Sequence, residues 1–214
     1  MAQAGSTFDW FLPIHSAEMP AIRLFCFPHA GGSASSFSHW AGKLSQRIDV
    51  VAIAPPGRGS RMQEPLPDDT LAMAATIADG LKSQSDVPFA FFGHSFGSLV
   101  AYECARELQR RGQAAPVLLI ASAHEAPQLS GSEPTAWLHA LPDVEFLKEA
   151  RSCGFIPEEA VQNAELLAIL APVLRADLRL NEIYKHEVPA QLLTCPVVAF
   201  GGTADFIEPA ALQA

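Results

Sequence analysis

The sequence predicts an α/β fold with a mostly parallel sheet, helices on both faces of the sheet and a helical insertion late in the chain. Over the first 124 residues, short apolar runs typical of buried parallel strands alternate with amphipathic helical patterns. One run leads into residues 93–97, Gly-His-Ser-Phe-Gly. Residues 125–189 then show only helical patterns. We expect a core formed by residues 1–124 and 190–214, with residues 125–189 as a lid over the strand ends.

The composition is typical of a globular protein with a sizeable core. The chain has 214 residues, of which 49% are hydrophobic and 17% are charged, and this length suits one domain with an insertion. The 23 acidic and 14 basic residues give a net charge of -9, and no basic run indicates nucleic-acid binding. No stretch approaches the ~20 apolar residues of a membrane span.

The cysteines and the N-terminus point to a cytoplasmic protein. Residues 1–14 lack the charged start and apolar core of a signal peptide. The four cysteines are far apart and form no Cys-x-x-Cys pair, as expected of free thiols in a reducing compartment. They are Cys26, Cys104, Cys153 and Cys195. No motif in the chain indicates a metal or an organic cofactor.

The strands and helices of the core follow from the hydrophobic pattern. Short apolar runs predict strands at 23–27, 50–54, 89–92, 117–121 and 196–200. Residues 1–20, which contain Pro13 and Pro20, are expected to form a loose leader. A short helix is predicted over 37–44. A longer helix, capped by Thr70, ends near Leu81, and Gly112 ends the helix that follows Ser95.

The insertion is predicted to contain helices at 135–140, 144–151, 158–171 and 173–185. Pro172 either begins the last of these or kinks one long helix. Apolar residues of the insertion would give the lid an underside suited to an acyl chain, although most of them should pack the lid onto the core. They are Phe146, Leu147, Phe155, Ile156, Leu166, Leu167 and Leu170.

Ser95 is the candidate nucleophile. It lies in a Gly-x-Ser-x-Gly motif between an apolar run and a helical pattern, which is the setting of a nucleophile elbow. A serine hydroxyl reacts only when it is exposed, close to a base and near N–H groups that stabilise an oxyanion. The helix that begins near Phe96 directs its free N–H groups at this serine. The alternative is a plain turn between strand and helix.

Two further loops carry candidate site residues. The small-residue loop at 28–34 follows an early strand, where such folds supply a second oxyanion N–H, unless it is an ordinary glycine turn. His29 in this loop is expected to be a structural hydrogen-bonding residue. Asp205 follows the last predicted strand, where the triad acid falls, or else it caps the helix near Pro209. Asp177 is a rival acid, although nearby Arg175 and Arg179 favour a structural ion pair.

Four motifs give the chain a specific resemblance to a known family. They are Phe27-Pro28-His29-Ala30-Gly31-Gly32, Pro56-Gly57-Arg58-Gly59-Ser60-Arg61, Gly93-His94-Ser95-Phe96-Gly97, and Leu174-Arg175-Ala176-Asp177-Leu178 with Glu182 and Tyr184. With these, the sequence resembles the type II (editing) thioesterases that accompany polyketide and nonribosomal peptide synthases. The resemblance covers about residues 24–209.

This resemblance implies an α/β-hydrolase fold with a helical lid and no cofactor. It implies hydrolysis of acyl groups from the phosphopantetheine arm of acyl or peptidyl carrier proteins. By position, Ser95 would be the nucleophile and Asp205 the triad acid, and the N–H groups of Ala30 and Phe96 would form the oxyanion hole.

The sequence departs from the family at the general base. The family's histidine follows a further strand beyond the acid, whereas none of the nine residues after Asp205 is histidine. His94 adjoins Ser95 and cannot turn back onto its hydroxyl, which leaves His124 as the stand-in. We therefore expect a shortened chain that lacks the last strand and helix and has little activity.

Two other functions remain open at this point. The chain could be a carboxylester hydrolase or acyltransferase of the same fold. It could also be a non-catalytic module that binds carrier proteins and lacks the base.

Overall fold

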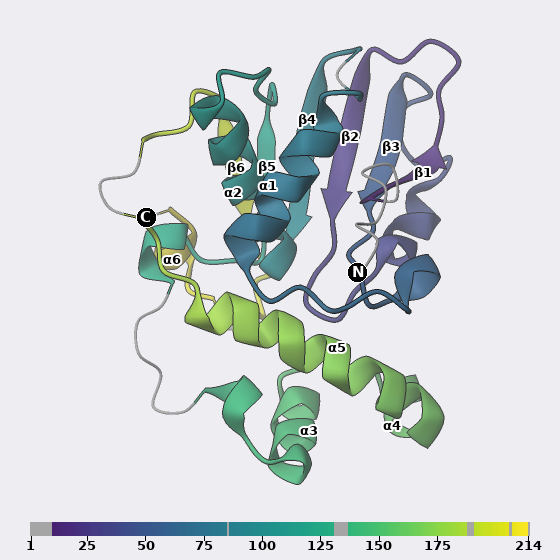
Figure 1. Cartoon of the computed structure of the whole chain (residues 1–214), viewed down its shortest axis with the longest axis vertical. Helices are drawn as coiled ribbons and strands as arrows, with labels where there is room; N and C mark the ends of the chain where they lie inside the picture. Colours follow the sequence, from purple (N-terminus) through teal and green to yellow (C-terminus); the bar gives the residue numbers. More distant parts are fainter. Residues whose placement is uncertain (1–9, 85, 131–136, 188–190, 206, 214) are drawn as a thin grey trace, which may run out of the picture.

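The computed structural model describes residues 10–84, 86–130, 137–187, 191–205 and 207–213. These residues form a six-stranded sheet in the order β1-β3-β2-β4-β5-β6 (Figure 1). The strands are β1 (Phe11–His15), β2 (Ile22–Phe27), β3 (Ile48–Ile53), β4 (Phe89–His94), β5 (Leu119–Ser122) and β6 (Val197–Phe200). All neighbouring pairs are parallel except β1 and β3. The predicted mostly parallel sheet is therefore confirmed.

Strand β1 corrects the expectation of a loose leader, of which residues 1–9 lie outside the described residues. Phe11 pairs with Ile53 in antiparallel register, and the Ala54 N–H donates to the Trp10 carbonyl at 2.9 Å. Trp10 is buried beneath the Arg61 guanidinium. Pro13 argues against a strand in the sequence, because proline cannot donate a backbone hydrogen bond. However, β1 lies at the edge of the sheet, where a proline is tolerated.

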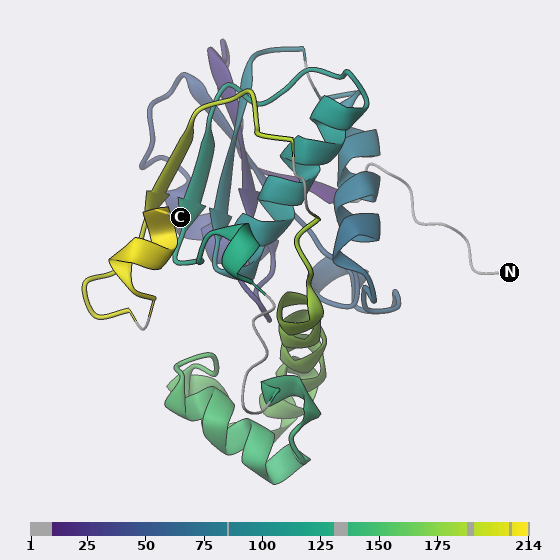
Figure 2. The same ribbon diagram turned by 90° about the vertical axis from the view of Figure 1, so that its left-hand side faces the viewer.

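Two helices cover one face of the sheet and a short helix covers the other. Helices α1 (Thr70–Leu81) and α2 (Phe96–Arg110) pack on the face that carries Phe25, Phe27 and Phe91 (Figure 2). The 3₁₀ helix η2 (Ala34–Trp40) packs on the alternate residues, including Cys26 and Phe92. This alternation follows from the period of two along a strand.

Two helix starts differ from those predicted. Helix η2 begins and ends earlier than the predicted 37–44, because Ser33 accepts the Ser35 N–H and caps it. Asp69, not Thr70, caps α1: its Oδ1 accepts the Ala72 N–H at 2.7 Å. Thr70 lies buried in the first turn.

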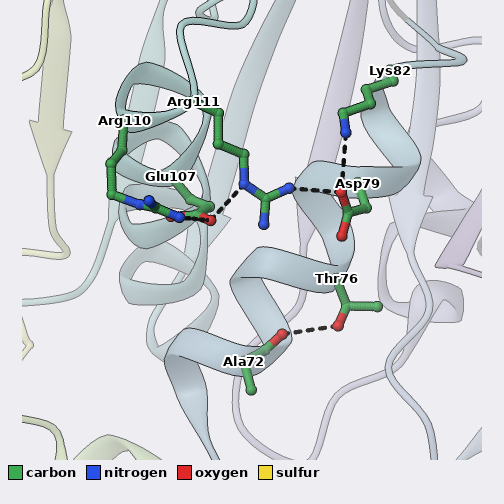
Figure 3. A network of polar contacts seen from close by, with 7 residues as sticks. All are labelled: Ala72, Thr76, Asp79, Lys82, Glu107, Arg110 and Arg111. Carbon is green, nitrogen blue, oxygen red and sulfur yellow. Dashed lines mark hydrogen bonds and ion pairs between the residues drawn. The ribbon is translucent and has the colours of Figure 1, made fainter.

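Helices α1 and α2 are also joined by ion pairs at the end of α2 remote from Ser95 (Figure 3). Arg111 donates to Glu107 of its own helix at 2.5 Å and to Asp79 of α1 at 2.7 Å. Arg110 and Lys82 bind the same two carboxylates. Gly112 then ends the helix with a positive φ of 64°, as predicted. Exposed pairs of this kind each stabilise a fold by at most about 1 kcal/mol.

The insertion lies below the carboxyl ends of the strands (Figures 1 and 2). Besides two short 3₁₀ turns, η4 (Pro127–Leu129) and η5 (Leu138–Ala140), it contains α3 (Asp143–Ser152), α4 (Glu158–Val161) and α5 (Ala164–Ile183). Asn163 caps α5 and so divides the predicted 158–171 helix. Pro172 lies inside α5, so of the two alternatives left open for this proline the structure has one long helix. The short helix α6 (Pro209–Gln213) follows β6.

Two parts of the predicted insertion fall outside the described residues. They are the segment from 131 to 136, in which Thr135 begins a predicted helix, and the boundary at 189–190. Among the helices that are described, none is long and apolar enough to cross a membrane.

Candidate active site

Ser95 occupies a strained turn between β4 and α2. Its φ is 52° and its ψ is −128°, a conformation that residues with a side chain rarely adopt. Two short backbone hydrogen bonds hold the turn: the Ser95 N–H donates to Ser122 O, and the Ser98 N–H donates to Ser95 O, both at 2.7 Å. The Ser95 side chain makes no capping bond to α2. Its hydroxyl is therefore available for chemistry rather than used to begin the helix.

The two glycines of the motif allow the strand, the turn and the helix to approach closely. A Cβ at Gly93 would overlap the backbone of Gly97 and Ser98. A Cβ at Gly97 would overlap the carbonyl of Phe27, at the end of neighbouring strand β2. The elbow predicted from the sequence is thus packed as its glycine spacing requires.

A cavity of about 630 Å³ opens over Ser95. It is lined by residues of both predicted loops and of the insertion: His29, Ala30, Ser36, Phe37, His39, Trp40, Phe92, His94, Ser95, Ala123, Cys153, Gly154, Phe155, Pro157 and Asp205. The structure therefore brings Ser95, Ala30 and Asp205, which are far apart in the sequence, around one space. The Phe96 side chain is buried elsewhere in the core, while its backbone begins α2 beside Ser95.

Asp205 lies in the turn that follows β6. Its backbone N–H donates to Gly202 O at 3.1 Å, and its Oδ1 accepts the Ile207 N–H at 3.3 Å. The second contact is a local turn bond of the kind that the alternative interpretation expects. The same residue also lines the cavity, so a local structural contact and a place at the site coexist.

Two histidine rings stand beside the nucleophile. The rings of His29 and His94 meet edge to face with centroids 5.9 Å apart. His94 Nδ1 lies 3.0 Å from Ser122 Oγ, which holds the ring toward β5. Burial lowers the pKa of His94, and the Asp205 carboxylate opposes this shift. Burial also lowers the pKa of His29, and His94 adds to that effect. Both shifts favour the neutral form of the imidazole.

His124, the predicted stand-in base, is engaged elsewhere. Its Nε2 lies 2.9 Å from Asn181 Oδ1 and its Nδ1 lies 2.8 Å from Glu125 O. It lines a different cavity, of about 710 Å³, between α2, β6 and residues 191–193. The structure thus places His124 away from Ser95.

Asp177 is a structural residue, as expected, but its partner differs from those expected. Its carboxylate pairs with Arg58, at 2.5 Å and 2.8 Å, whereas Arg175 binds Asp143 and Arg179 donates weakly to the Asp68 carbonyl. Asp177 Oδ2 also accepts the Gly31 N–H at 2.8 Å. The pair therefore binds the loop that holds Ala30.

As expected, most of the apolar residues named for the insertion do not line the cavity. Phe155 lines the space above Ser95, whereas Phe146 is buried under the Arg175 guanidinium. Leu147, Ile156 and Leu167 line a second cavity of about 560 Å³ among the insertion's own helices.

Some lining residues were not predicted. Trp40 and Phe92 form an aromatic wall with ring centroids 4.9 Å apart. The sequence shows that both residues are aromatic, but it does not show that their side chains face the site. Ala123 has a φ of 52°, and nothing in its residue type indicates so strained a conformation. Among the described residues, no group of three or more His, Cys, Asp or Glu side chains is arranged to hold a metal ion.

A mostly parallel sheet with a serine at a strained turn between strand and helix, below a helical insertion, defines the α/β-hydrolase fold. The family model of the thioesterase domain matches residues 22–213, so the chain belongs to the thioesterase family. It is an acyl-thioester hydrolase.

Relatives and solved structures agree with this assignment. The chain is 36% identical over 198 residues to the gramicidin S biosynthesis protein GrsT of Aneurinibacillus migulanus, covering 92% of this chain and 75% of that protein. It is 37% identical to the thioesterase PikA5 of Streptomyces venezuelae, covering 92% and 69%. The type II thioesterase BorB of the borrelidin biosynthetic cluster superposes with a TM-score of 0.85 at 31% identity, covering 99% and 84%. The predicted α/β-hydrolase fold and type II thioesterase family are confirmed.

Proposed function

We propose that this thioesterase releases acyl groups from the phosphopantetheine arm of an acyl or peptidyl carrier protein of a polyketide or nonribosomal peptide synthase in the cytoplasm. Ser95 is the nucleophile, Asp205 is the acid that orients a histidine base, and the N–H groups of Ala30 and Phe96 stabilise the oxyanion. The base is the one part of this triad to which no described residue is assigned.

One observation carries the proposal: Ser95, held at a strained turn, and Asp205 line the same cavity. Ala30 lines this cavity too, and it belongs to the loop that supplies an oxyanion donor in this fold. A helix N-terminus at Phe96 adds its dipole and its free N–H groups at the developing charge. Similarity to proteins of antibiotic biosynthesis supports the carrier-bound substrate.

The nucleophile is tested with a serine-directed phosphonate and peptide mapping. Ser95 is expected to be labelled faster than any other serine, and Ser95→Ala is expected to abolish this labelling. Ser36→Ala is the matched control, because Ser36 lines the same cavity. Labelling that persists in Ser95→Ala would refute the assignment.

The substrate is tested by presenting one acyl group on a holo carrier protein, on free pantetheine and as an oxygen ester. The proposal predicts that kcat/KM is highest for the carrier-bound thioester. Equal values for the carrier and for free pantetheine would remove the carrier protein as partner, and preference for the oxygen ester would favour the carboxylester alternative. Tight carrier binding without turnover would favour a binding module.

The insertion is proposed to be a lid that borders the acyl group. The turn between α3 and α4 supplies Gly154, Phe155 and Pro157 to the wall of the cavity. Gly154, with a φ of 75°, allows the sharp change of direction there. Hydrogen exchange of residues 137–187 is expected to slow when an acyl-pantetheine thioether binds, while exchange in β4 stays unchanged. An equal change in both regions would count against a lid.

A further inference from the structure

Arg58 and Asp177 form an ion pair that is almost fully withdrawn from solvent. The residues are 8% and 2% exposed, and they pair in a bidentate arrangement: Arg58 Nη1 donates to Asp177 Oδ2, and Nη2 donates to Oδ1. Arg58 lies in the loop that follows β3, and Asp177 lies on α5, the long helix of the insertion. A buried pair of this kind contributes little net stability, because removing two charges from water costs several kcal/mol per ion. Stability alone therefore gives a weak reason for its presence.

The pair encloses the turn that contains Ala30. The Gly32 N–H donates to the His29 carbonyl at 2.9 Å, which closes a four-residue turn. Gly31 has a φ of 75° at the third position, as a glycine there permits. Because the His29 carbonyl and the Ala30 N–H belong to one planar peptide group, this bond also sets the direction of the Ala30 N–H.

Both members of the pair bind the backbone of this turn. Asp177 Oδ2 accepts the Gly31 N–H at 2.8 Å, and Arg58 Nη1 donates to the Gly32 carbonyl at 3.1 Å. The Leu174 side chain packs against the same turn, 3.3 Å from the position of a Cβ at Gly31. Asp177 thereby fixes the peptide group between Ala30 and Gly31, and Arg58 fixes the one between Gly32 and Ser33. The first of these directly follows the peptide that carries the Ala30 N–H, which is left little freedom to rotate.

We propose that Arg58 and Asp177 are positioning residues for the oxyanion hole, holding the turn at His29–Gly32 so that the Ala30 N–H meets the oxyanion. Because Asp177 belongs to α5, the same contacts link the placement of the insertion to this donor. The inference rests on the proposed role of Ala30.

The matched control for this pair lies at the other end of the sheet. Asp49 Oδ1 accepts the Ala17 N–H at 2.8 Å, and its Oδ2 accepts from Arg23 Nη2 at 3.0 Å and Nε at 3.2 Å. It thus combines one backbone N–H and one arginine, as Asp177 does, but lies beside the amino ends of β2 and β3. Asp177→Asn and Asp49→Asn therefore remove the same kind of interaction near the site and far from it.

The test compares two inhibitors that carry the same alkyl chain. A boronic acid forms a tetrahedral adduct with the nucleophile and needs the oxyanion donors, whereas an unreactive pantetheine thioether reports ground-state binding only. Asp177→Asn is expected to weaken boronate binding about 10- to 100-fold, since loss of a whole oxyanion donor costs about 10²–10³ in rate. Thioether binding should change less than about twofold, and Asp49→Asn should leave both affinities as they are.

A double-mutant cycle separates positioning from folding. Arg58→Lys keeps the charge but loses the bidentate pairing, and it should also weaken the boronate. The double variant with Asp177→Asn should lose no more than the worse single variant, because both act through one turn. Thermal unfolding is measured for every variant, and Arg58→Lys serves in place of Asp177→Asn if the latter does not fold.

The outcomes distinguish this inference from the proposed function. If Ser95→Ala binds the boronate as tightly as the unchanged protein does, the proposed nucleophile is wrong. If Ser95→Ala loses the boronate while folded Asp177→Asn and Arg58→Lys bind it normally, only the positioning role is overturned. Parallel losses of boronate and thioether affinity would also overturn it, because they indicate general damage to the cavity.

Discussion

The nucleophile and the acid of the proposed site lie on strands of opposite character. β4, which leads to Ser95, is paired on both sides, and its Phe91 is fully buried. β6, which leads to Asp205, lies at the edge of the described sheet, and Val197, Val198 and Phe200 are each about half exposed. In Figure 2, β6 and α6 stand at the margin of the molecule, away from α1 and α2. One half of the site is thus built into the core, and the other half is attached to it.

The attached half is held by the parallel pairing of β6 with β5 and by backbone contacts beyond the ends of these strands. The Ala123 N–H donates to Phe200 O at 2.8 Å, and the Ala126 N–H donates to Ala211 O at 2.7 Å. These bonds join the segment around Asp205 to the chain that follows β5. Steric packing thus determines the position of Ser95, whereas main-chain pairing along one side of β6 determines the position of Asp205. Substitutions in the two halves should therefore differ sharply in their effect on stability.

The largest difference is expected between two glycine substitutions. Gly93→Ala should destabilise the protein by more than about 3 kcal/mol or prevent folding, because the new Cβ would overlap the backbone of α2. Gly202→Ala should change the free energy of unfolding by less than about 0.5 kcal/mol, because its nearest contact would be Asp205 Cβ at 3.9 Å. Urea unfolding of both variants measures the difference. Equal stabilities would show that the elbow tolerates a side chain and would break the comparison.

A pair of phenylalanines tests the same contrast without altering backbone freedom. Phe91→Ala should cost about 3–5 kcal/mol, because it leaves a cavity between the sheet and α2. Phe200→Ala should cost about 1 kcal/mol, because the ring is already 47% exposed. Both values come from the same urea experiment. A larger loss for Phe200→Ala would mean that β6 is integrated into the core as deeply as β4.

The sequence predicted the strands after β1 and the elbow better than it predicted β1 and the helix caps. β2 to β5 and the elbow at Ser95 follow from local signals: continuous apolar runs, two glycines around a serine, and an amphipathic helix. Strand β1 was missed because Pro13 and short length conceal an edge strand. The cap at Asp69 was missed although aspartate caps helices as well as threonine does.

Local sequence patterns do not predict which residues far apart in the chain come into contact. Arg58 and Asp177 are 119 residues apart, whereas spacing alone favours the nearer Arg175 and Arg179 as partners of Asp177. Only the fold shows that α5 passes beneath the loop after β3.

Pro172 is a second feature that tertiary packing determines. It lies within α5, where burial of Val173 and Leu174 against the core offsets the lost backbone bond. Tertiary packing therefore determines both the partner of Asp177 and the continuity of α5 across Pro172.

The smallest expected effect concerns a charge that acts across the two halves. Burial lowers the pKa of His94, and Asp205 partly opposes this. The His94 side chain takes up a proton near pH 6.5 in the unfolded chain but only at lower pH in the folded protein. Between these two pH values the unfolded state therefore binds more protons than the folded state. Stability should therefore fall as the pH drops below about 6.5.

Two variants separate the contribution of His94 from that of other groups. His94→Gln should reduce the loss of stability between pH 7.5 and pH 5.5, measured by urea midpoints, whereas exposed His39→Gln should leave it unchanged. Asp205→Asn should enlarge the loss, because removing the opposing carboxylate lowers the pKa of His94 further. In the His94→Gln background, Asp205→Asn should no longer enlarge the loss of stability between pH 7.5 and pH 5.5. If Asp205→Asn enlarges the loss equally in both backgrounds, the Asp205 carboxylate does not act on His94, and the two halves of the site are electrostatically independent.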